Sequence, residues 1–356
     1  MSLKIENISD DSAPTLPAKL GFGQIFSRRM FTQEWTEASG WHNAKIGPYQ
    51  NISLPPSTAV FHYAQEIFEG TKAYRRADGN INLFRPWENA RRFNRSAKRM
   101  AMQLVDEESH VDAMAQLVKL EHQWVPNGAG ESLYIRPTMI ATEPALGVHA
   151  SGSYLHYIIV GPVSAYFATG LNPVPVFISD QYVRAVRGGT GEAKCGGNYA
   201  ASLIVGEEVR AKGYQQVLWL DGVERKYVEE VGAMNIAFAY GKHIITPALS
   251  GTILPGITRD SVLKLAPDLG YTVSEEGIDV NQILRDLQNG QITEAFGMGT
   301  AAVIAPVGKF GYLEKDYIVN GNQTGPIAQH LYKTLTDIQY GRIADPYGWT
   351  HTIAVK

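Results

Sequence analysis

The sequence predicts an α+β protein of two domains, and two observations carry this prediction. Its 356 residues exceed the length of about 100–200 residues that is typical of one domain. Apolar segments that alternate as strands are joined as hairpins more often than through a helix, which excludes a doubly wound nucleotide-binding fold. Hydrophobic residues make up 44% of the chain, so a disordered or fibrous protein is excluded as well.

The first domain is predicted over residues 1–165 and begins with a polar, proline-containing arm over residues 1–20, expected to be poorly ordered. Periodicity then predicts, in order, a strand at 81–86, a helix at 89–102, a helix at 111–124, and buried strands at 133–141 and 154–163. The stretch 166–175 has two prolines, a glycine and no periodicity. We expect it to connect the first domain to a second one over residues 176–356.

The second domain is predicted from hairpins and helices that follow a glycine-dense loop at residues 187–198. Asp221-Gly222 is typical of a left-handed turn between two strands and is expected to join 217–220 to 223–230. The other predicted elements are a strand at 176–180, a helix at 199–213, a hairpin over 236–247, helices at 258–270 and 279–290, a strand-turn-strand unit over 292–308 and a last helix at 328–341.

Charge and composition exclude several classes of function. The chain has 32 Lys and Arg against 35 Asp and Glu, a net charge of −3, and no run dense in basic residues, which argues against nucleic-acid binding. No apolar run reaches the ~18–20 residues that span a bilayer, and the first residues lack the apolar core of a secretory signal. We therefore expect a cytoplasmic protein whose partners are small molecules, with neither nucleic acid nor membrane among them.

Metal and disulfide chemistry have no support in the sequence. Cys195 is the single cysteine, so it can form neither an intrachain disulfide nor a cysteine-based metal site. The nine histidines never occur at the short spacings with which two histidines bind one metal ion. No metal site is predicted.

The glycine-dense loop contains one lysine, Lys194, but the loop does not match a P-loop. That motif needs glycine directly before the lysine and Ser or Thr after it, whereas Ala193 and Cys195 are its neighbours. The string GMGTAA at 297–302 has the glycine spacing of a dinucleotide fingerprint, yet a predicted strand follows it instead of a helix. A dinucleotide oxidoreductase is therefore the weakest alternative. Taken alone, Lys194 is more readily explained as a surface lysine on a mobile loop.

Four segments in a fixed order give Lys194 a different meaning. They are GEAKCGGNY at 191–199, EVGAMN at 230–235, LPGITRD at 254–260 and GMGTAA at 297–302, preceded by FEG at 68–70 and FRPWENARRF at 84–93. Together they resemble the branched-chain amino-acid aminotransferases, a family of fold-type-IV pyridoxal-phosphate enzymes, from about residue 61 to residue 307. The resemblance implies a small α/β domain and a larger domain with a hairpin-rich, barrel-like sheet and flanking helices.

The resemblance implies a transaminase of the EC 2.6.1 class that works by a ping-pong scheme. L-Leucine, L-isoleucine or L-valine would leave as its 2-oxo acid, and 2-oxoglutarate would collect the amine as L-glutamate. The amine would pass through pyridoxal 5'-phosphate held as a Schiff base on Lys194, in a homodimer with active sites near the interface. A partly desolvated amine near other cations loses its proton readily, as this chemistry requires.

The resemblance also assigns cofactor residues. Lys194 matches the catalytic lysine that moves the substrate α-proton, and Glu230 matches the carboxylate that pairs with the pyridine nitrogen. Tyr199 matches the phenol that bonds the ring oxygen, and Arg92 matches the arginine whose fork suits the phosphate. The other cofactor residues are Leu254 against the ring face, Ile257 and Thr258 at a helix N-terminus that favours an anion, and Thr300 on the glycine-rich turn.

Substrate residues follow in the same way. An apolar pocket with one reachable cation would accept both branched side chains and glutamate. Arg136, two residues after Tyr134 and so on the same strand face, matches the residue that takes the distal carboxylate of glutamate. The other substrate residues are Phe68, Tyr134 and Tyr166 in the side-chain pocket, Tyr63 at the partner-subunit edge, Thr300 and Ala301 with amides for the α-carboxylate, and Val148 on a loop that reaches into the other subunit's site.

Some residues keep a structural interpretation beside the functional one. Each pocket aromatic could be a core side chain. Arg91 and Arg95 are interpreted as solvated helix charges, and Glu229 as a surface neighbour of Glu230. The Cys-x-x-Cys pair that follows the glycine-rich turn in animal members of the family is absent, so their thiol switch is not expected.

Rival functions stay open at this point. D-amino-acid aminotransferases and aminodeoxychorismate lyases share the lysine, the glutamate and the phosphate residues, but they lack the Tyr134-x-Arg136 element. A non-catalytic vitamin carrier would tolerate the loss of Lys194, Glu230 or Tyr199, and none is lost. Preference among leucine, isoleucine, valine and aromatic substrates is not fixed, because one methylene changes selectivity by only ~1–3 kcal/mol.

Overall fold

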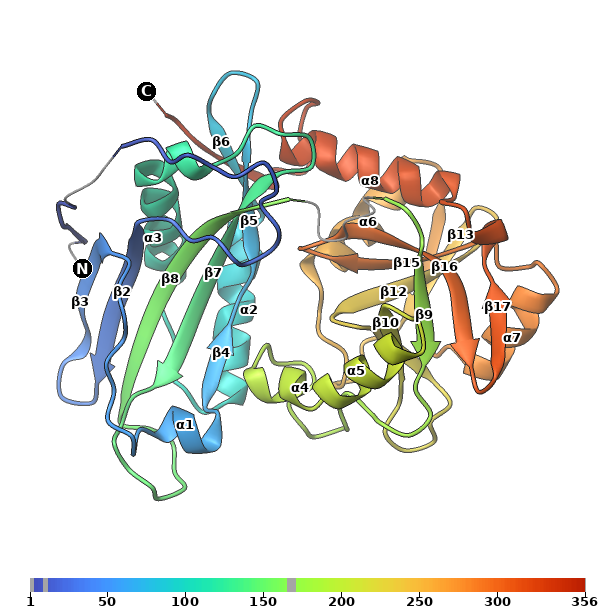
Figure 1. The fold of residues 1–356 in the computed structure, drawn as a ribbon, viewed down its shortest axis with the longest axis horizontal. Helices are drawn as coiled ribbons and strands as arrows, with labels where there is room; N and C mark the ends of the chain where they lie inside the picture. Colours follow the sequence, from blue (N-terminus) through green and yellow to red (C-terminus); the bar gives the residue numbers. More distant parts are fainter. Residues whose placement is uncertain (1–2, 9–11, 165–170, 356) are drawn as a thin grey trace. The chain divides into compact units, whose positions relative to one another are not determined.

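The computed structural model describes residues 3–8, 12–164 and 171–355, which divide into two units (Figure 1). The first unit contains Met1–Tyr166, Ala193–Gly196 and Asp337–Lys356, and the second contains Phe167–Glu192 and Gly197–Thr336. The chain therefore leaves the first unit and returns to it twice. Parts of the predicted arm and of the predicted connection at 166–175 lie outside the described residues, and the domain boundaries stay a prediction.

The first unit contains a nine-stranded sheet in the order β1-β3-β2-β8-β7-β5-β6-β18, with β4 also paired to β7. All its pairs are antiparallel except β1 with β3. The strands are β1 Lys4–Ile5, β2 Arg29–Thr36, β3 Gly40–Pro48, β4 Glu66–Phe68, β5 Thr71–Arg75, β6 Ile81–Phe84, β7 Ser132–Ala141, β8 Ser153–Val163 and β18 Thr350–Ile353.

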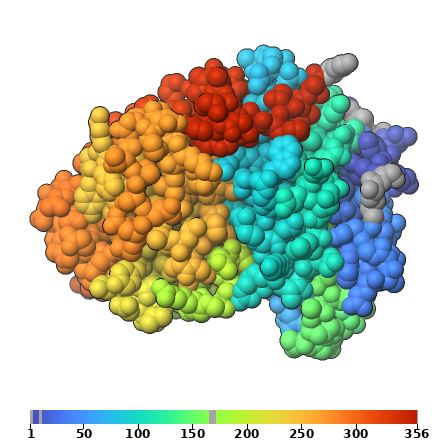
Figure 2. All heavy atoms as spheres, turned by 180° about the vertical axis from the view of Figure 1, so that it is seen from behind, coloured from blue at the N-terminus to red at the C-terminus, as the bar shows by residue number. Residues whose placement is uncertain are grey.

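The helices of this part of the chain are α1 Ala59–Tyr63, α2 Pro86–Arg99, α3 Glu107–Leu120 and the 3₁₀ turn η1 His122–Trp124. Helices α2 and α3 cover one face of the sheet. Helix α2 buries Ala90, Phe93 and Ala97 at helical spacing, and Asp106 caps α3 by accepting from the Ser109 amide at 2.9 Å. In Figure 2 the turquoise atoms of α2 and α3 form the outer surface of this face.

The second unit contains another nine-stranded sheet, in the order β11-β10-β9-β16-β15-β12-β13-β14, with β17 on β16. A further pairing of β11 with β12 closes β9, β10, β11, β12, β15 and β16 into a barrel. The strands are β9 Val174–Ile178, β10 Gln216–Leu220, β11 Val228–Val231, β12 Met234–Tyr240, β13 His243–Pro247, β14 Thr272–Glu276, β15 Glu294–Gly299, β16 Val303–Tyr312 and β17 Lys315–Ile318.

Apolar side chains from β9, β12 and β16, among them Val176, Phe238 and Phe310, pack in the core of the second unit together with side chains of α7. The helices of this part of the chain are α4 Gly196–Ala200, α5 Leu203–Ala211, α6 Ile257–Asp268, α7 Val280–Gln288, the 3₁₀ turn η2 Asn320–Asn322 and α8 Pro326–Gln339. Within the described ranges, none of the helices is both long and apolar enough to cross a bilayer.

Two predicted turns have different outcomes. Gly241, at a φ of 58°, joins β12 to β13 in a two-residue turn, as the pattern at 236–247 predicts. The expected tight turn at Asp221-Gly222 is wrong, because β11 begins only at Val228 and residues 221–227 form a loop. The Asp221 carboxylate accepts from four backbone amides of this loop, and these donors outweigh its burial and lower its pKa to about 2.

Candidate active site

The backbone of Lys194 is fixed within the first unit. Its amide donates to the Ser96 hydroxyl on α2 at 2.9 Å, and its carbonyl accepts from the Phe68 amide at the end of β4 at 3.0 Å. Its neighbours Ala193 and Cys195 are buried against side chains of α2 and β7. Lys194 is therefore attached to a helix and a strand, and the interpretation as a lysine on an unsupported surface loop is wrong.

Lys194 faces a cluster of predicted substrate residues on β4 and β7. Its Nζ lies 4.8 Å from the centroid of the Phe68 ring, and the Arg136 guanidinium lies 4.7 Å from the same centroid. Arg136 also lies over the Tyr134 ring and donates to its hydroxyl at 2.9 Å. The structure thus brings Lys194, Phe68, Tyr134 and Arg136 together around one aromatic ring.

Arg92, the predicted phosphate arginine, forms a buried ion pair with Glu69. Its Nε and one terminal nitrogen contact the two Glu69 carboxylate oxygens at 2.7 and 2.9 Å, and Asn89 donates to the same carboxylate at 2.7 Å. Burial raises the pKa of Glu69, but Arg92, together with Lys194 and Asn89, outweighs it, so that pKa is lowered. Arg91 and Arg95 on the same helix are exposed. Helix α2 thus points one selected arginine inward.

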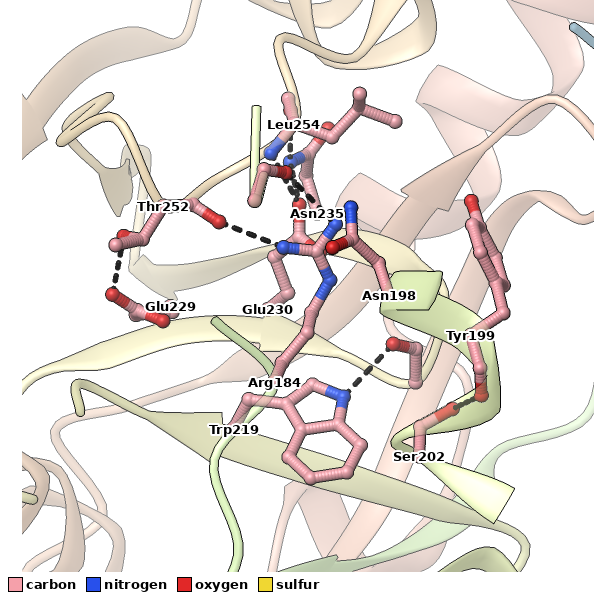
Figure 3. Close-up of polar contacts among 12 residues, drawn as sticks. Arg184, Asn198, Tyr199, Ser202, Trp219, Glu229, Glu230, Asn235, Thr252 and Leu254 are labelled. Carbon is pink, nitrogen blue, oxygen red and sulfur yellow. Dashed lines mark hydrogen bonds and ion pairs between the residues drawn. The ribbon is translucent and has the colours of Figure 1, made fainter. Parts of the chain in front are cut away.

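In the second unit, Glu230 lies in a row across three neighbouring strands. It pairs with Asn235 between β11 and β12, and Asn235 pairs with Met298 between β12 and β15. The Glu230 side chain is buried, and its carboxylate accepts from the Leu254 amide at 2.9 Å and the Asn235 amide group at 3.2 Å and pairs with Arg184 at 2.7 Å (Figure 3). A carboxylate with these donors is oriented and stabilised in its charged form.

Arg184 is a residue of this cluster that the sequence analysis missed. Its Nε contacts Glu230, and one terminal nitrogen donates to the Thr252 carbonyl at 2.7 Å (Figure 3). The other terminal nitrogen donates to the Gly191 carbonyl at 3.1 Å. It therefore ties the glycine-dense loop to the Glu230 carboxylate. The only signal in the sequence was a basic residue near the start of that loop, and Arg187, the first residue of the loop, gives the same signal although it is exposed.

The segment after Lys194 is held by its own side chains. Asn198 both accepts from the Thr190 hydroxyl and donates to the Thr190 carbonyl, each at 2.7 Å, so it closes the loop on itself. Tyr199 follows on the short helix α4, and its carbonyl accepts from the Ser202 hydroxyl (Figure 3). The ring of Tyr199 is half-buried.

The start of α6 has the features of an anion site. Gly256 precedes the helix, no side chain caps it, and Ile257 and Thr258 are buried in its first turn. A Cβ on Gly256 would come within 1.9 Å of the Asn235 side-chain Oδ1, so a larger residue there would displace the Asn235 side chain that contacts Glu230. Asn235 contacts Glu230 and donates to Leu254 at 3.0 Å.

Thr300 and Ala301 form the turn that joins β15 to β16. Met298, near the end of β15, pairs with Asn235. Thr300 and Ala301 themselves are partly exposed. The second unit therefore combines a helix N-terminus, a turn and a charged buried carboxylate around Asn235. These groups suit a planar cofactor that carries a phosphate at one end and a protonated ring nitrogen at another.

A pocket of about 630 Å³ in the second unit is separate from this cluster. It is lined by Glu229 and not by Glu230, because successive side chains of a strand point to opposite faces. The interpretation of Glu229 as a surface residue is wrong: it is 4% exposed and accepts a hydrogen bond from the Thr252 hydroxyl. Burial raises the pKa of its carboxyl.

Two predicted substrate residues, Tyr63 and Val148, lie elsewhere in the first unit, and a third, Tyr166, lies outside the described residues. Tyr63, on α1 in the first unit, is partly exposed and donates to the Leu146 carbonyl. Val148 is 84% exposed on the loop between β7 and β8. Among the described residues, there is no group of three or more His, Cys, Asp or Glu side chains that could bind a metal ion.

Comparison with known proteins places these features in a family. Residues 66–310 match the family model described as "Amino-transferase class IV". The chain is 49% identical over 348 residues to the probable branched-chain-amino-acid aminotransferase of Streptomyces coelicolor, covering 98% of this chain and 96% of that protein. It is 50% identical over 335 residues to branched-chain-amino-acid transaminase 1 of Bacillus subtilis, covering 94% of each.

Solved structures agree. A "T.th." branched-chain amino acid aminotransferase complexed with N-(5'-phosphopyridoxyl)-L-glutamate is similar at a TM-score of 0.77 and 26% identity, covering 93% of this chain and 100% of that one. The Escherichia coli branched-chain amino acid aminotransferase has a TM-score of 0.74 at 25% identity, covering 90% and 99%. These similarities confirm the predicted fold class, with a barrel-like sheet in the second unit.

Proposed function

We propose the following reaction for this chain, which belongs to the class IV aminotransferases and, within them, to the branched-chain-amino-acid aminotransferases. The family, the enzyme class and the cofactor pyridoxal 5'-phosphate predicted from the motifs are thereby confirmed. L-Leucine, L-isoleucine or L-valine donates its amino group and leaves as the 2-oxo acid. 2-Oxoglutarate then takes up the amino group and leaves as L-glutamate.

The observation that carries the proposal is the buried Glu230 carboxylate with Arg184, Asn235 and the Leu254 amide as donors. When bound, pyridoxal phosphate supplies a conjugated ring that accepts the electron pair left at the substrate α-carbon. With the cofactor bound, the Glu230 carboxylate, paired with Arg184, would hold the proton on the ring nitrogen. Because Asn235 and the Leu254 amide fix the carboxylate, this charge is in place before any substrate binds.

Lys194 moves the proton of the reaction. Its backbone is held by Ser96 and Phe68, so the reach of its side chain is set from a fixed origin. With pyridoxal phosphate bound, the Lys194 amine would act as the base that takes the proton from the substrate α-carbon and later returns it. The Phe68 ring shields one side of the amine from water.

The remaining assignments follow the resemblance. Arg92 and Thr300, with Ile257 and Thr258 at the start of α6, would hold the phosphate. Tyr199 would bond the ring oxygen and Leu254 would pack on the ring face. For the substrate, Phe68, Tyr134 and Tyr166 would line the side-chain pocket, Arg136 would take the distal carboxylate of glutamate, and the amides of Thr300 and Ala301 the α-carboxylate. Tyr63 and Val148 would act at the edge of a homodimer.

The visible absorption band of the bound cofactor tests the proposal. Excess L-isoleucine should bleach the band and 2-oxoglutarate should restore it. Lys194→Ala should slow both changes about 10²–10⁴-fold, because it removes the group that transfers the proton. An enzyme whose band ignores L-isoleucine but responds to D-alanine would act on the opposite enantiomer, and the proposal would be wrong.

A further inference from the structure

Arg136 and Glu66 carry opposite charges on the predicted substrate face of the first unit. Among the described residues, neither one forms an ion pair at hydrogen-bond distance. Arg136 donates to the Tyr134 hydroxyl, but its Nε is buried, and in the described part of the chain no group accepts from it. The Arg136 guanidinium stacks on Phe68 and Tyr134, which supply no negative charge. The cation is thus shielded from water and only partly satisfied.

The second charge is Glu66, two residues before Phe68 on β4 and so on the same face of the sheet. Glu66 is half-buried, and among the residues that the structure describes its carboxylate makes neither a hydrogen bond nor an ion pair. Burial raises its pKa, and the nearby Arg136 cation opposes that rise. Arg136 is therefore within electrostatic reach of Glu66 but not in contact with it.

The Glu66 carboxylate also lies against the segment that contains Lys194. A Cβ on Gly196 would come within 1.9 Å of a Glu66 carboxylate oxygen. Tyr157, on the neighbouring strand β8, is influenced by Glu66 and Arg136 in opposite directions, although burial dominates and raises its pKa. Glu66 thus lies between the lysine segment and the cationic end of the predicted side-chain pocket.

We propose that Glu66 is the internal counter-ion of Arg136 and sets the balance between apolar and acidic substrates. The inference rests on the proposed function, in which one pocket accepts both. With a branched side chain bound, Arg136 has no substrate charge to meet, and Glu66 offsets its positive charge. With 2-oxoglutarate bound, the substrate carboxylate meets Arg136, and Glu66 becomes a nearby charge of the same sign that weakens binding.

The two ligand classes should therefore respond in opposite directions to Glu66→Gln. Glutamine keeps the size of the side chain next to Gly196 and removes only the charge. In the holoenzyme, calorimetry should give a Kd for glutarate that falls about 3- to 10-fold and a Kd for 4-methylpentanoate that rises by a similar factor, as expected for one partly screened charge. The KM values for 2-oxoglutarate and L-leucine should move in the same two directions.

Two further variants complete the test. Glu108→Gln makes the same charge change at an exposed position on α3 and should shift neither Kd. In an Arg136→Met background, Glu66→Gln should no longer weaken 4-methylpentanoate binding, because the charge that it offsets is gone.

The outcomes separate the two proposals. Wild-type enzyme that transaminates L-leucine with 2-oxoglutarate, together with Glu66→Gln shifts that are absent or of the same sign for both ligands, would overturn the role of Glu66 alone. Wild-type enzyme that transfers no amino group between these substrates would overturn the proposed function and, with it, this inference.

Discussion

Two carboxylates, Glu230 in the second unit and Glu66 in the first, differ in burial and in the number of hydrogen-bond partners that hold them. Glu230 in the second unit is 2% exposed and has an arginine, a side-chain amide and a backbone amide at hydrogen-bond distance. Glu66 in the first unit is half-buried and has no such partner among the described residues. A charge that must not change during a reaction is held by several donors. Glu66, for which we propose a role toward two kinds of ligand, is held by fewer groups, so its influence on those ligands can be tuned.

Removing Arg184 should produce the largest effect on the strongly held side. Arg184→Met leaves the Glu230 carboxylate buried without its cation, which costs about 3–5 kcal/mol for a buried pair. Urea unfolding of the cofactor-free protein measures this loss, and Arg184→Lys should lose less because it keeps the charge. If Arg184→Met unfolded at the wild-type urea concentration, Glu230 would not depend on this ion pair.

Glu230→Gln tests the chemical role of the same carboxylate. The amide fits among the same neighbours but cannot balance a protonated ring nitrogen, so kcat with L-leucine should fall about 10²–10³-fold. Glu229→Gln is the matched control, since the adjacent side chain faces the pocket on the other side of β11. Equal losses in the two variants would point to a general disturbance of the strand.

Two buried histidines should make the folding stability of the first unit fall at acidic pH. His110 and His156 stack in the core at 4.9 Å, and burial lowers the pKa of His110 from 6.5 to about 4 and that of His156 well below 6.5. Below pH 6.5 the unfolded chain binds more protons than the folded one, so stability falls as the pH falls. For His110 alone the loss from pH 7 to pH 5 is about 2 kcal/mol.

Urea unfolding at the two pH values measures this effect, and His110→Phe should reduce the difference. An unchanged difference in that variant would exclude His110 as its source. The Glu230 cluster contains no histidine, so acid should loosen the first unit before it affects this cluster.

The smallest predicted effect concerns the hydroxyl of Tyr134. Tyr134→Phe removes the hydrogen bond to Arg136, which is worth about 0.5–1.5 kcal/mol, so the Kd for glutarate should rise a few-fold. The Kd for 4-methylpentanoate should change less, because its apolar end does not use the arginine. A larger change for the apolar ligand would show that the hydroxyl shapes the pocket rather than aims Arg136.

Much of the Glu230 cluster could be predicted because its geometry is local. Glu230 and Asn235 are five positions apart, and Gly232, at a φ of 58°, turns the chain so that they pair across β11 and β12. Motif spacing alone places both residues. The burial of Glu229 could not be predicted in the same way, because an acidic pair at a strand end does not reveal that Thr252 will cover it.

The contacts of Arg184 and Glu66 could not be predicted from the sequence. Arg184 meets Glu230 across 46 positions of the chain, and nothing near either residue announces the contact. Glu66 has no motif of its own, and its position becomes informative only with Gly196 and Arg136 in place. The pairing of Arg92 with Glu69 was equally hidden, although both lie inside recognised motifs.

The return of the chain to the first unit makes that unit a composite that no single cut can isolate. Residues 193–196 and 337–356 belong to it, and β18 provides the outer partner of β6. A fragment that ended near residue 165 would keep most of the sheet but lose β18, which would leave β6 as an unpaired edge strand. Its free backbone N–H and C=O groups could pair with another copy and cause aggregation. The fragment would also lack Lys194. The enzyme should therefore not divide into two separately expressible modules, and a split version would have to share the last segment in trans.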